Sequence, residues 1–171
     1  MIYIDADDFH ESNTDFDILQ YLHKKNGMKF NLFTVPGMCS KEFINEMKKI
    51  PWIDMIPHGW KHQTSRECEK WGMMESSMYL QNLKRYDLTR GFKAPGWRTS
   101  RALYEALMDE GYWICDHHDH DGIRPSGMKV YHIPDDCHFH IGGTMENRIT
   151  NNIEQLEKLR GPFGFIKDLF Q

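Results

Sequence analysis

The sequence predicts a single α/β domain built from parallel βαβ units. The chain has 171 residues, the length of one domain. It is 40% apolar and 27% charged, an ordinary globular balance. Short apolar runs alternate with segments of helical spacing, and no repeat interrupts them, so we treat residues 1–171 as one domain. Such units form a barrel or an open doubly wound sheet, and both place reactive residues at the carboxyl ends of the strands.

The first third of the chain carries clear helix signals. A helix over Thr14–Asn26 begins at a cap formed by Asn13 or Thr14 and ends at Gly27. Ser40 caps a second helix. The strands expected here are Met1–Ile4, Lys29–Val35 and Trp52–Ile56.

The rest of the chain continues the alternation. Thr64 and Glu67 have capping-box spacing, which predicts a helix opening after His62. Ser100 caps a helix that ends at Gly111. The other helical segments expected are Met74–Leu88, Asn151–Leu159 and Lys167–Phe170, and the other strands are Phe92–Ala94, Tyr112–Cys115, Val130–Ile133, Cys137–Ile141 and Phe163–Ile166.

Charge and apolar patterning exclude several partners. The formal charge is −4, from 25 acidic and 21 basic residues without a basic tract, which argues against nucleic acid. No apolar run has the length of a membrane span. The chain begins with an apparent strand instead of a signal peptide, and its four cysteines form no CxxC pair. We therefore expect a cytoplasmic protein with free thiols, and the sequence leaves its oligomeric state open.

Two groups of metal-type side chains follow predicted strands. Asp5, Asp7 and Asp8 come directly after an apolar run and repel one another unless a cation or proton intervenes; a solvated turn is the alternative. His58 and His62 have i,i+4 spacing, which on a helical turn brings their Cβ atoms within about 5–6 Å. Imidazole suits zinc, cobalt, nickel or iron, and a surface histidine pair is the alternative.

A third group follows the strand at Phe92–Ala94. A Pro95-Gly96 turn stands beside Trp97 and two cations, Lys93 and Arg98, a combination that suits recognition of a sugar ring and a carboxylate. A tight turn with a packing tryptophan explains the same residues equally well.

Downstream, two histidine-rich segments complete the candidates. His138 and His140 share one face of a predicted strand. The segment Asp116–Asp121 is dense in aspartate and histidine, which leaves two interpretations open: a second metal site, or a solvated loop near the active site.

In this order the segments resemble the motifs of the polysaccharide deacetylase family, the NodB-homology domain of carbohydrate esterase family 4. Asp5–Phe9 resembles the family's T-F-D-D-G motif, and His58 and His62 match its H-S/T-x-x-H motif. Phe92–Trp97 is similar to F-R-A-P-G-W, and His138–His140 to L-x-H. The resemblance runs across nearly the whole chain.

The resemblance implies a distorted (β/α) barrel of about seven strands and a role for each matching residue. Asp8, His58 and His62 would hold one divalent metal ion, with zinc favoured over cobalt or nickel. Asp7 would be the general base and His140 the general acid. Three protein ligands leave positions open for a water and a substrate carbonyl, which the ion activates and polarises.

Three residues depart from the family pattern. Lys93 replaces the usual arginine, so its contact with Asp7 becomes a single point, with Arg98 as a possible second partner. Phe9 replaces glycine and narrows the cleft, and His138 stands at an apolar position, where it competes with His140 for the acid role. Asp116 most resembles the aspartate of the fourth motif. The expected substrate-binding residues are Trp97, Pro95, Arg98, Trp60 and Asp116.

The activity that the resemblance implies is hydrolysis of an N-acetyl or other N-acyl group from an amino sugar, an oligosaccharide or a polysaccharide. The expected partner is therefore a carbohydrate or a small N-acylated molecule. Two alternatives stay open: a catalytically silent carbohydrate-binding protein, against which the presence of Asp7 argues, and an amidase that acts on a non-sugar amide or cyclic imide.

Overall fold

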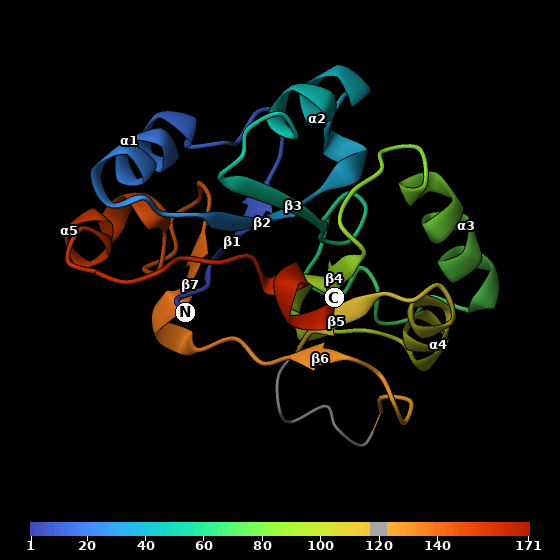
Figure 1. Ribbon diagram of the computed structural model, residues 1–171. Helices are drawn as coiled ribbons and strands as arrows, with labels where there is room; N and C mark the ends of the chain where they lie inside the picture. Colours follow the sequence, from blue (N-terminus) through green and yellow to red (C-terminus); the bar gives the residue numbers. More distant parts are fainter. Residues whose placement is uncertain (117–122) are drawn as a thin grey trace.

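The computed structural model describes residues 1–116 and 123–171 (Figure 1). Strands and helices alternate along most of the chain, as expected from the sequence. The strands are β1 (Ile4–Phe9), β2 (Phe30–Thr34), β3 (Ile53–Pro57), β4 (Gly91–Lys93), β5 (Trp113–Cys115), β6 (Val130–Tyr131) and β7 (His138–His140). The helices are α1 (Phe16–Asn26), α2 (Lys41–Met47), α3 (Met73–Leu83), α4 (Arg101–Asp109) and α5 (Ile153–Leu156). Short 3₁₀ turns are η1 (Pro36–Met38), η2 (Pro95–Trp97), η4 (Asp135–Cys137), η5 (Ile149–Asn151) and η6 (Ile166–Phe170).

The described strands form two parallel sheets with the orders β3-β2-β1-β7 and β4-β5-β6. A parallel bridge between His58 and Lys93 joins them where β3 and β4 end. The parallel βαβ organisation is therefore confirmed. A closed barrel is not seen in the described residues, since β6 and β7 do not pair there. β6 has only two residues, and Pro134, which lacks a backbone N–H, lies in the connection to β7.

The first strand lies further along the chain than predicted. We expected Met1–Ile4, but β1 runs through the aspartates to Phe9. Residues 4–6 pair with β2, and residues 5–7 pair with β7 on the other side. Because both neighbours saturate its backbone, β1 keeps strand geometry through Asp5 and Asp7, whose side chains are buried.

Local end signals predicted helix boundaries well. The Ser40 and Ser100 hydroxyls accept hydrogen bonds from the third residue beyond, Phe43 and Leu103, as N-caps do. Gly27 ends α1 in the left-handed conformation, at φ 72°. The predicted start of α1 is wrong by one or two residues, since its N-cap is Asp15.

Several predicted elements are wrong or shorter than expected. The helix expected over Met74–Leu88 ends at Leu83, and the strand expected over Val130–Ile133 ends at Tyr131. The segment after His62 consists of turns and bends instead of a helix. The segment Phe163–Ile166 forms only an isolated bridge between Ile2 and Phe163 before η6 begins. α5 covers just Ile153–Leu156, because η5 takes up the start of the expected helix.

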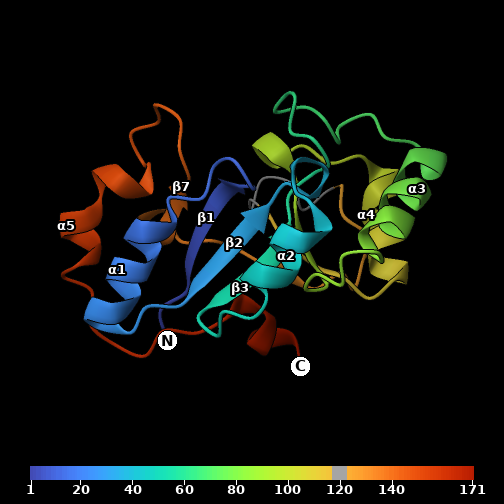
Figure 2. The same ribbon diagram turned by 90° about the horizontal axis from the view of Figure 1, so that it is seen from above.

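Helices cover the outer faces of the two sheets (Figures 1 and 2). Apolar side chains pack between the sheets. α1, α2 and α5 pack on the four-stranded sheet, whereas α3 and α4 lie side by side over the smaller one. The layer between the sheets includes Phe33 and Ile56 from one sheet, Trp113 and Cys115 from the other, and Ile166 from η6. This inner core packs β2 and β3 of one sheet against β5 of the other.

Two further expectations concern the whole chain. Among the residues that the structure describes, no helix combines the length and apolar character that a membrane crossing requires. All four cysteines lie in the described ranges and are free thiols. Burial raises the pKa of Cys39 and of Cys137 to about 11, which makes both thiols poorly reactive near neutral pH.

Candidate metal centre

The candidate site lies where the carboxyl ends of β1, β3, β4 and β7 meet. Asp7 and Asp8 are consecutive, and in a regular strand their side chains would point to opposite faces. The register of β1 against β2 shifts between Ala6 and Phe9, and Asp8 has φ 66°. This bulge turns the Asp8 carboxylate toward the same side as Asp7. Both carboxylates then lie 3.7 Å from Nε2 of His58.

His58 presents one nitrogen to the site because its other nitrogen is engaged. Its Nδ1 lies 3.0 Å from the carbonyl oxygen of Lys93, to which it donates. This leaves Nε2 directed at the aspartates, and metal-ligating histidines typically have their other nitrogen bonded to a backbone carbonyl in this way. Burial lowers the pKa of His58 to about 4, so that the imidazole is neutral, the form that ligates metals.

A glutamate holds the loop between the two histidines. The Glu67 carboxylate accepts hydrogen bonds from the backbone N–H groups of Trp60, Lys61 and His62, at 2.9–3.1 Å. The predicted helical turn is wrong, since Gly59 and His62 have left-handed φ angles of 61° and 50°. The rings of His58 and His62 nevertheless lie 5.0 Å apart between centroids. The hydrogen bonds to Glu67 therefore hold the loop in a conformation that brings the two imidazoles together.

The donor set fits one divalent cation. Oδ1 of Asp8 lies 3.7 Å from Nε2 of His58 and 3.3 Å from Nε2 of His62. Two ligands that each bind a tetrahedral ion at about 2.1 Å are about 3.4 Å apart, so these separations need little adjustment. Two imidazole nitrogens and a carboxylate oxygen are also the donor types that zinc and its neighbours take.

A second group, Asp7, His138 and His140, also brings its donor atoms within 4.8 Å of one another. This group already holds a cation, because Nζ of Lys93 donates to Oδ1 of Asp7 at 2.7 Å and lies 3.3 Å from Nδ1 of His138. A metal ion there would repel the buried ammonium group. We therefore assign the candidate metal position to Asp8, His58 and His62.

Lys93 keeps Asp7 ionised. Its ammonium group is 1% exposed and lies 4.1 Å from the centroid of the Trp97 ring. Burial alone would raise the pKa of Asp7, but Lys93 and His58 outweigh burial and hold that pKa below its usual value. The expected single-point contact between Lys93 and Asp7 is present. Arg98 does not add a second contact, since it pairs with Glu69.

The two histidines of β7 have different partners. The ring of His140 hydrogen-bonds Oδ2 of Asp8 through Nδ1 at 3.0 Å. The ring of His138 hydrogen-bonds Oδ2 of Asp5 through Nδ1 at 2.7 Å. Sequence reasoning treated Asp5 only as part of an acidic turn. Its signal is the period of two in Ile4-Asp5-Ala6-Asp7, which places both aspartates on one face of a strand.

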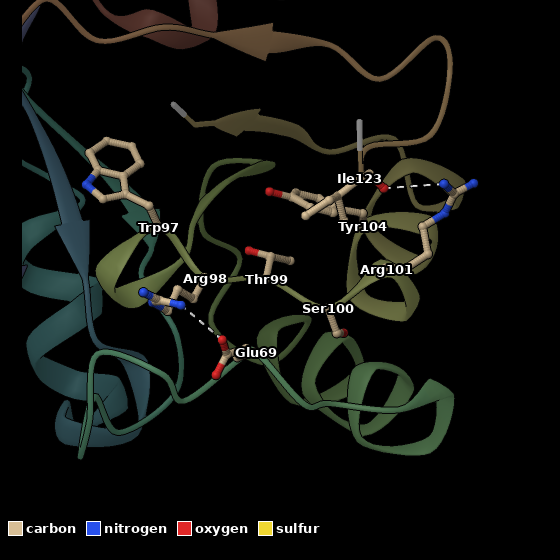
Figure 3. Close-up of a pocket in the computed structure, with 8 residues that line it drawn as sticks. All are labelled: Glu69, Trp97, Arg98, Thr99, Ser100, Arg101, Tyr104 and Ile123. Atoms are coloured by element: carbon tan, nitrogen blue, oxygen red, sulfur yellow. Dashed lines mark hydrogen bonds and ion pairs between the residues drawn. The ribbon is translucent and has the colours of Figure 1, made fainter. Parts of the chain in front are cut away.

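The expected substrate-binding residues divide into two sets. Trp97 and Arg98 line a cavity of about 340 Å³ together with Thr99 and Tyr104 (Figure 3). This cavity adjoins the candidate centre through Trp97, whose ring packs edge-on against His138.

The other three expected substrate-binding residues make packing contacts or hydrogen bonds with neighbouring residues of the protein. Pro95 is buried against Gly59. Trp60 packs against Tyr79, on the α3 side of its loop. Asp116 is buried and accepts a hydrogen bond from the Tyr104 hydroxyl. The remaining residues of the aspartate and histidine cluster, 117–121, lie outside the described residues.

One solved structure has a similar fold. The chain superposes on the crystal structure of the Xyl-CE4 domain of a multidomain xylanase from the hindgut metagenome of Trinervitermes trinervoides. The TM-score is 0.64, and the match covers 99% of this chain and 88% of that one at 11% identity. The two share a fold. No family model matches the sequence, and no curated protein matches it either.

Proposed function

We propose that the protein is a metal-dependent hydrolase that removes an acetyl group from the amino group of a carbohydrate. The observation that carries the proposal is that a three-donor metal site and a separate carboxylate lie side by side. Asp8, His58 and His62 offer a three-donor metal site, and Asp7 stands beside it as an ionised carboxylate that is not needed as a ligand. The fold shared with a domain of a xylanase supports a carbohydrate substrate.

The residues divide the chemistry between them. Asp8, His58 and His62 would hold the ion, which, when bound, supplies Lewis acidity toward a water and an acyl oxygen. Asp7 accepts a proton from the attacking water. Lys93 keeps Asp7 deprotonated and fixes its orientation through the 2.7 Å contact. A histidine of β7 donates the proton that the departing nitrogen requires, a role that the resemblance gives to His140.

A substrate screen with a metal assay tests the proposal. Acetate release is measured on N-acetylated amino sugars, their oligomers, O-acetylated sugars and simple N-acetyl amides, with zinc, cobalt and nickel loaded in turn. Release from N-acetylated sugars that depends on the metal supports the proposal. Release only from simple amides assigns an amidase, and sugar binding without acetate release assigns a silent binding protein.

A further inference from the structure

The two histidines of β7 face different tasks because different carboxylates hold them. Parallel pairing sets Asp5 opposite His138 and Asp7 opposite His140. His140 is bonded to Asp8, the candidate ligand, by the oxygen that does not face His58 and His62. This contact orients Asp8, as outer-shell partners of metal ligands do.

His138 is set up differently. Its Nδ1 is bonded to Asp5, which leaves Nε2 as the nitrogen nearest the base, 3.8 Å from Oδ2 of Asp7. Its side chain is 15% exposed, enough for contact with a substrate. Asp5 and Asp7 place two carboxylates against the ring, whereas Lys93 places one ammonium group there. The ring of His138 therefore lies between the buried carboxylate that holds it and the carboxylate proposed as the base.

Asp5 is buried in an environment that disfavours a carboxylate, so its presence there does not stabilise the fold by burial. It is 1% exposed, and within the described parts of the chain its Oδ1 has no hydrogen-bond partner. Burial raises the pKa of Asp5, against the opposing effects of the His138 hydrogen bond and the Lys93 charge. A carboxylate in an apolar sheet is unfavourable unless its partners compensate. The hydrogen bond between Asp5 and His138 orients the imidazole ring, which is the role that we assign to Asp5.

We propose that His138 is the catalytic acid that protonates the leaving nitrogen, and that Asp5 is the positioning residue that directs its Nε2 toward the reaction. The inference rests on the proposed hydrolase function and replaces the role expected for His140. His140 becomes a partner of Asp8 that orients a metal ligand.

The proton balance closes within the described residues. The attacking water gives one proton to Asp7, and its oxygen bonds to the acyl carbon. As the C–N bond breaks, the nitrogen receives the proton from Nε2 of His138. The products are the free acid and the amine. Asp7 then returns its proton to His138 across the 3.8 Å that separates their atoms, which restores both groups.

The test compares two substrates whose leaving groups differ in their need for a proton. One is the N-acetylated sugar that the wild-type enzyme hydrolyses best, and the other is 4-nitrophenyl acetate, whose phenolate leaves unaided near neutral pH. For His138→Gln we expect kcat on the amide to fall at least about 100-fold while the aryl ester rate stays within about threefold. Asp5→Asn should give the same selective loss to a smaller extent, with KM for the amide unchanged.

His140→Gln and His23→Gln are the matched histidine controls. His140→Gln should weaken metal binding about 10–100-fold and, at saturating metal, lower both rates in parallel. His23, on α1, is bonded to the Met28 carbonyl and lies outside the site, so His23→Gln should retain both rates. Each variant is checked for metal content and thermal unfolding, so that a folding defect is separated from a loss of the acid.

The outcomes separate this inference from the function on which it rests. Full amide turnover in His138→Gln overturns the inference, as does an equal loss on both substrates at full metal occupancy. A selective loss in His140→Gln returns the acid role to that residue. A wild-type enzyme that hydrolyses no acetylated compound overturns the proposed function itself.

Discussion

At the scale of single residues, the candidate centre depends on carboxylates held in unequal states. Asp7 is kept ionised by a buried ammonium group, and Asp8 is turned toward the imidazoles by a bulge. The proposed function gives these two neighbours in sequence separate roles, base and ligand, and the change in backbone direction between them makes this division possible.

Asp7→Asn should retain metal and lose turnover. Asparagine preserves the shape of the side chain but cannot accept a proton from water, so kcat should fall about 10²–10⁴-fold on any substrate that the screen identifies. Metal content, measured by elemental analysis after gel filtration, should equal that of the wild type. Unchanged hydrolysis in Asp7→Asn would remove Asp7 from the proposed role.

At the scale of elements, the loop between His58 and His62 depends on one glutamate outside it. Glu67 accepts three backbone N–H groups of that loop, and its own segment lacks regular secondary structure. The loop conformation is therefore imposed by a side chain five to seven residues further along the chain.

Glu67→Ala should lower metal affinity about 10–100-fold while the protein stays folded, because the ligands remain but the loop that orients them loosens. Zinc titration against a competing chelator measures the change. Glu46→Ala, an exposed substitution on α2, is the matched control and should bind metal as the wild type does. Equal affinities in the two variants would contradict the role given to Glu67.

A second element-scale contact ties β3 to the end of the chain. Oδ1 of Asp54 accepts hydrogen bonds from the Thr89 hydroxyl at 2.6 Å and from Nζ of Lys167 at 2.8 Å. Burial nevertheless raises the pKa of Asp54 above its ordinary value of 3.8. A carboxyl whose pKa is raised on folding binds its proton more tightly in the folded state. Stability from this group is therefore present at low pH and is lost as the pH rises.

Asp54→Asn removes that pH dependence. The melting temperature of the wild type minus that of the variant should decrease as the pH rises from about 4 through the raised pKa, and should level off above it. Thermal unfolding of both proteins in matched buffers from pH 4 to 7 measures the difference. A difference that increases with pH would show that ion pairing with Lys167 outweighs burial.

At the scale of the whole molecule, the site joins two sheets. Asp7 and Asp8 come from one sheet, Lys93 from the other, and the His58–Lys93 bridge connects them. A ligand at this junction binds the folded state alone, because unfolding separates its donors. Metal binding and global stability are therefore linked.

Added zinc should raise the melting temperature. At a free concentration of about 100 times the dissociation constant, the gain is about 2.7 kcal/mol. For a chain of this length that corresponds to about 5–10 °C, and a chelator should reverse it. His58→Ala should abolish the shift. Differential scanning calorimetry measures it, and an equal shift in His58→Ala would place the bound ion elsewhere.

The sequence predicted those parts of the molecule that depend on neighbours along the chain. Ser40 and Ser100 cap helices as expected, and Gly27 ends one, since each acts on a backbone group a few residues away. The order of the motifs also predicted a mixed α/β domain with parallel strands, which the sheets and the likeness to the Xyl-CE4 domain confirm, whereas the closed barrel that it implied is not seen in the described residues.

The predictions were wrong where contacts outside the local sequence pattern determine the structure. β1 extends through Asp7 because β7, more than 120 residues later, pairs with it. The loop after Gly59 is not helical because the side chain of Glu67, five to seven residues further on, binds its N–H groups, a contact that helical spacing does not predict. The hydrogen bond between Asp5 and His138 could not be predicted, because Asp5 lies opposite His138 only after β1 and β7 have paired.

One backbone feature of the site has a consequence for engineering. Of the five non-glycine residues with positive φ in the described chain, three are site residues: Asp8, His62 and Trp97. An L-residue in that conformation costs of order 1–3 kcal/mol, which glycine avoids. Libraries sorted for heat resistance alone will accordingly enrich His62→Gly, which removes this strain together with a candidate ligand. Directed evolution of this scaffold therefore needs metal binding as a second selection criterion, because selection for heat resistance alone favours variants without a candidate ligand.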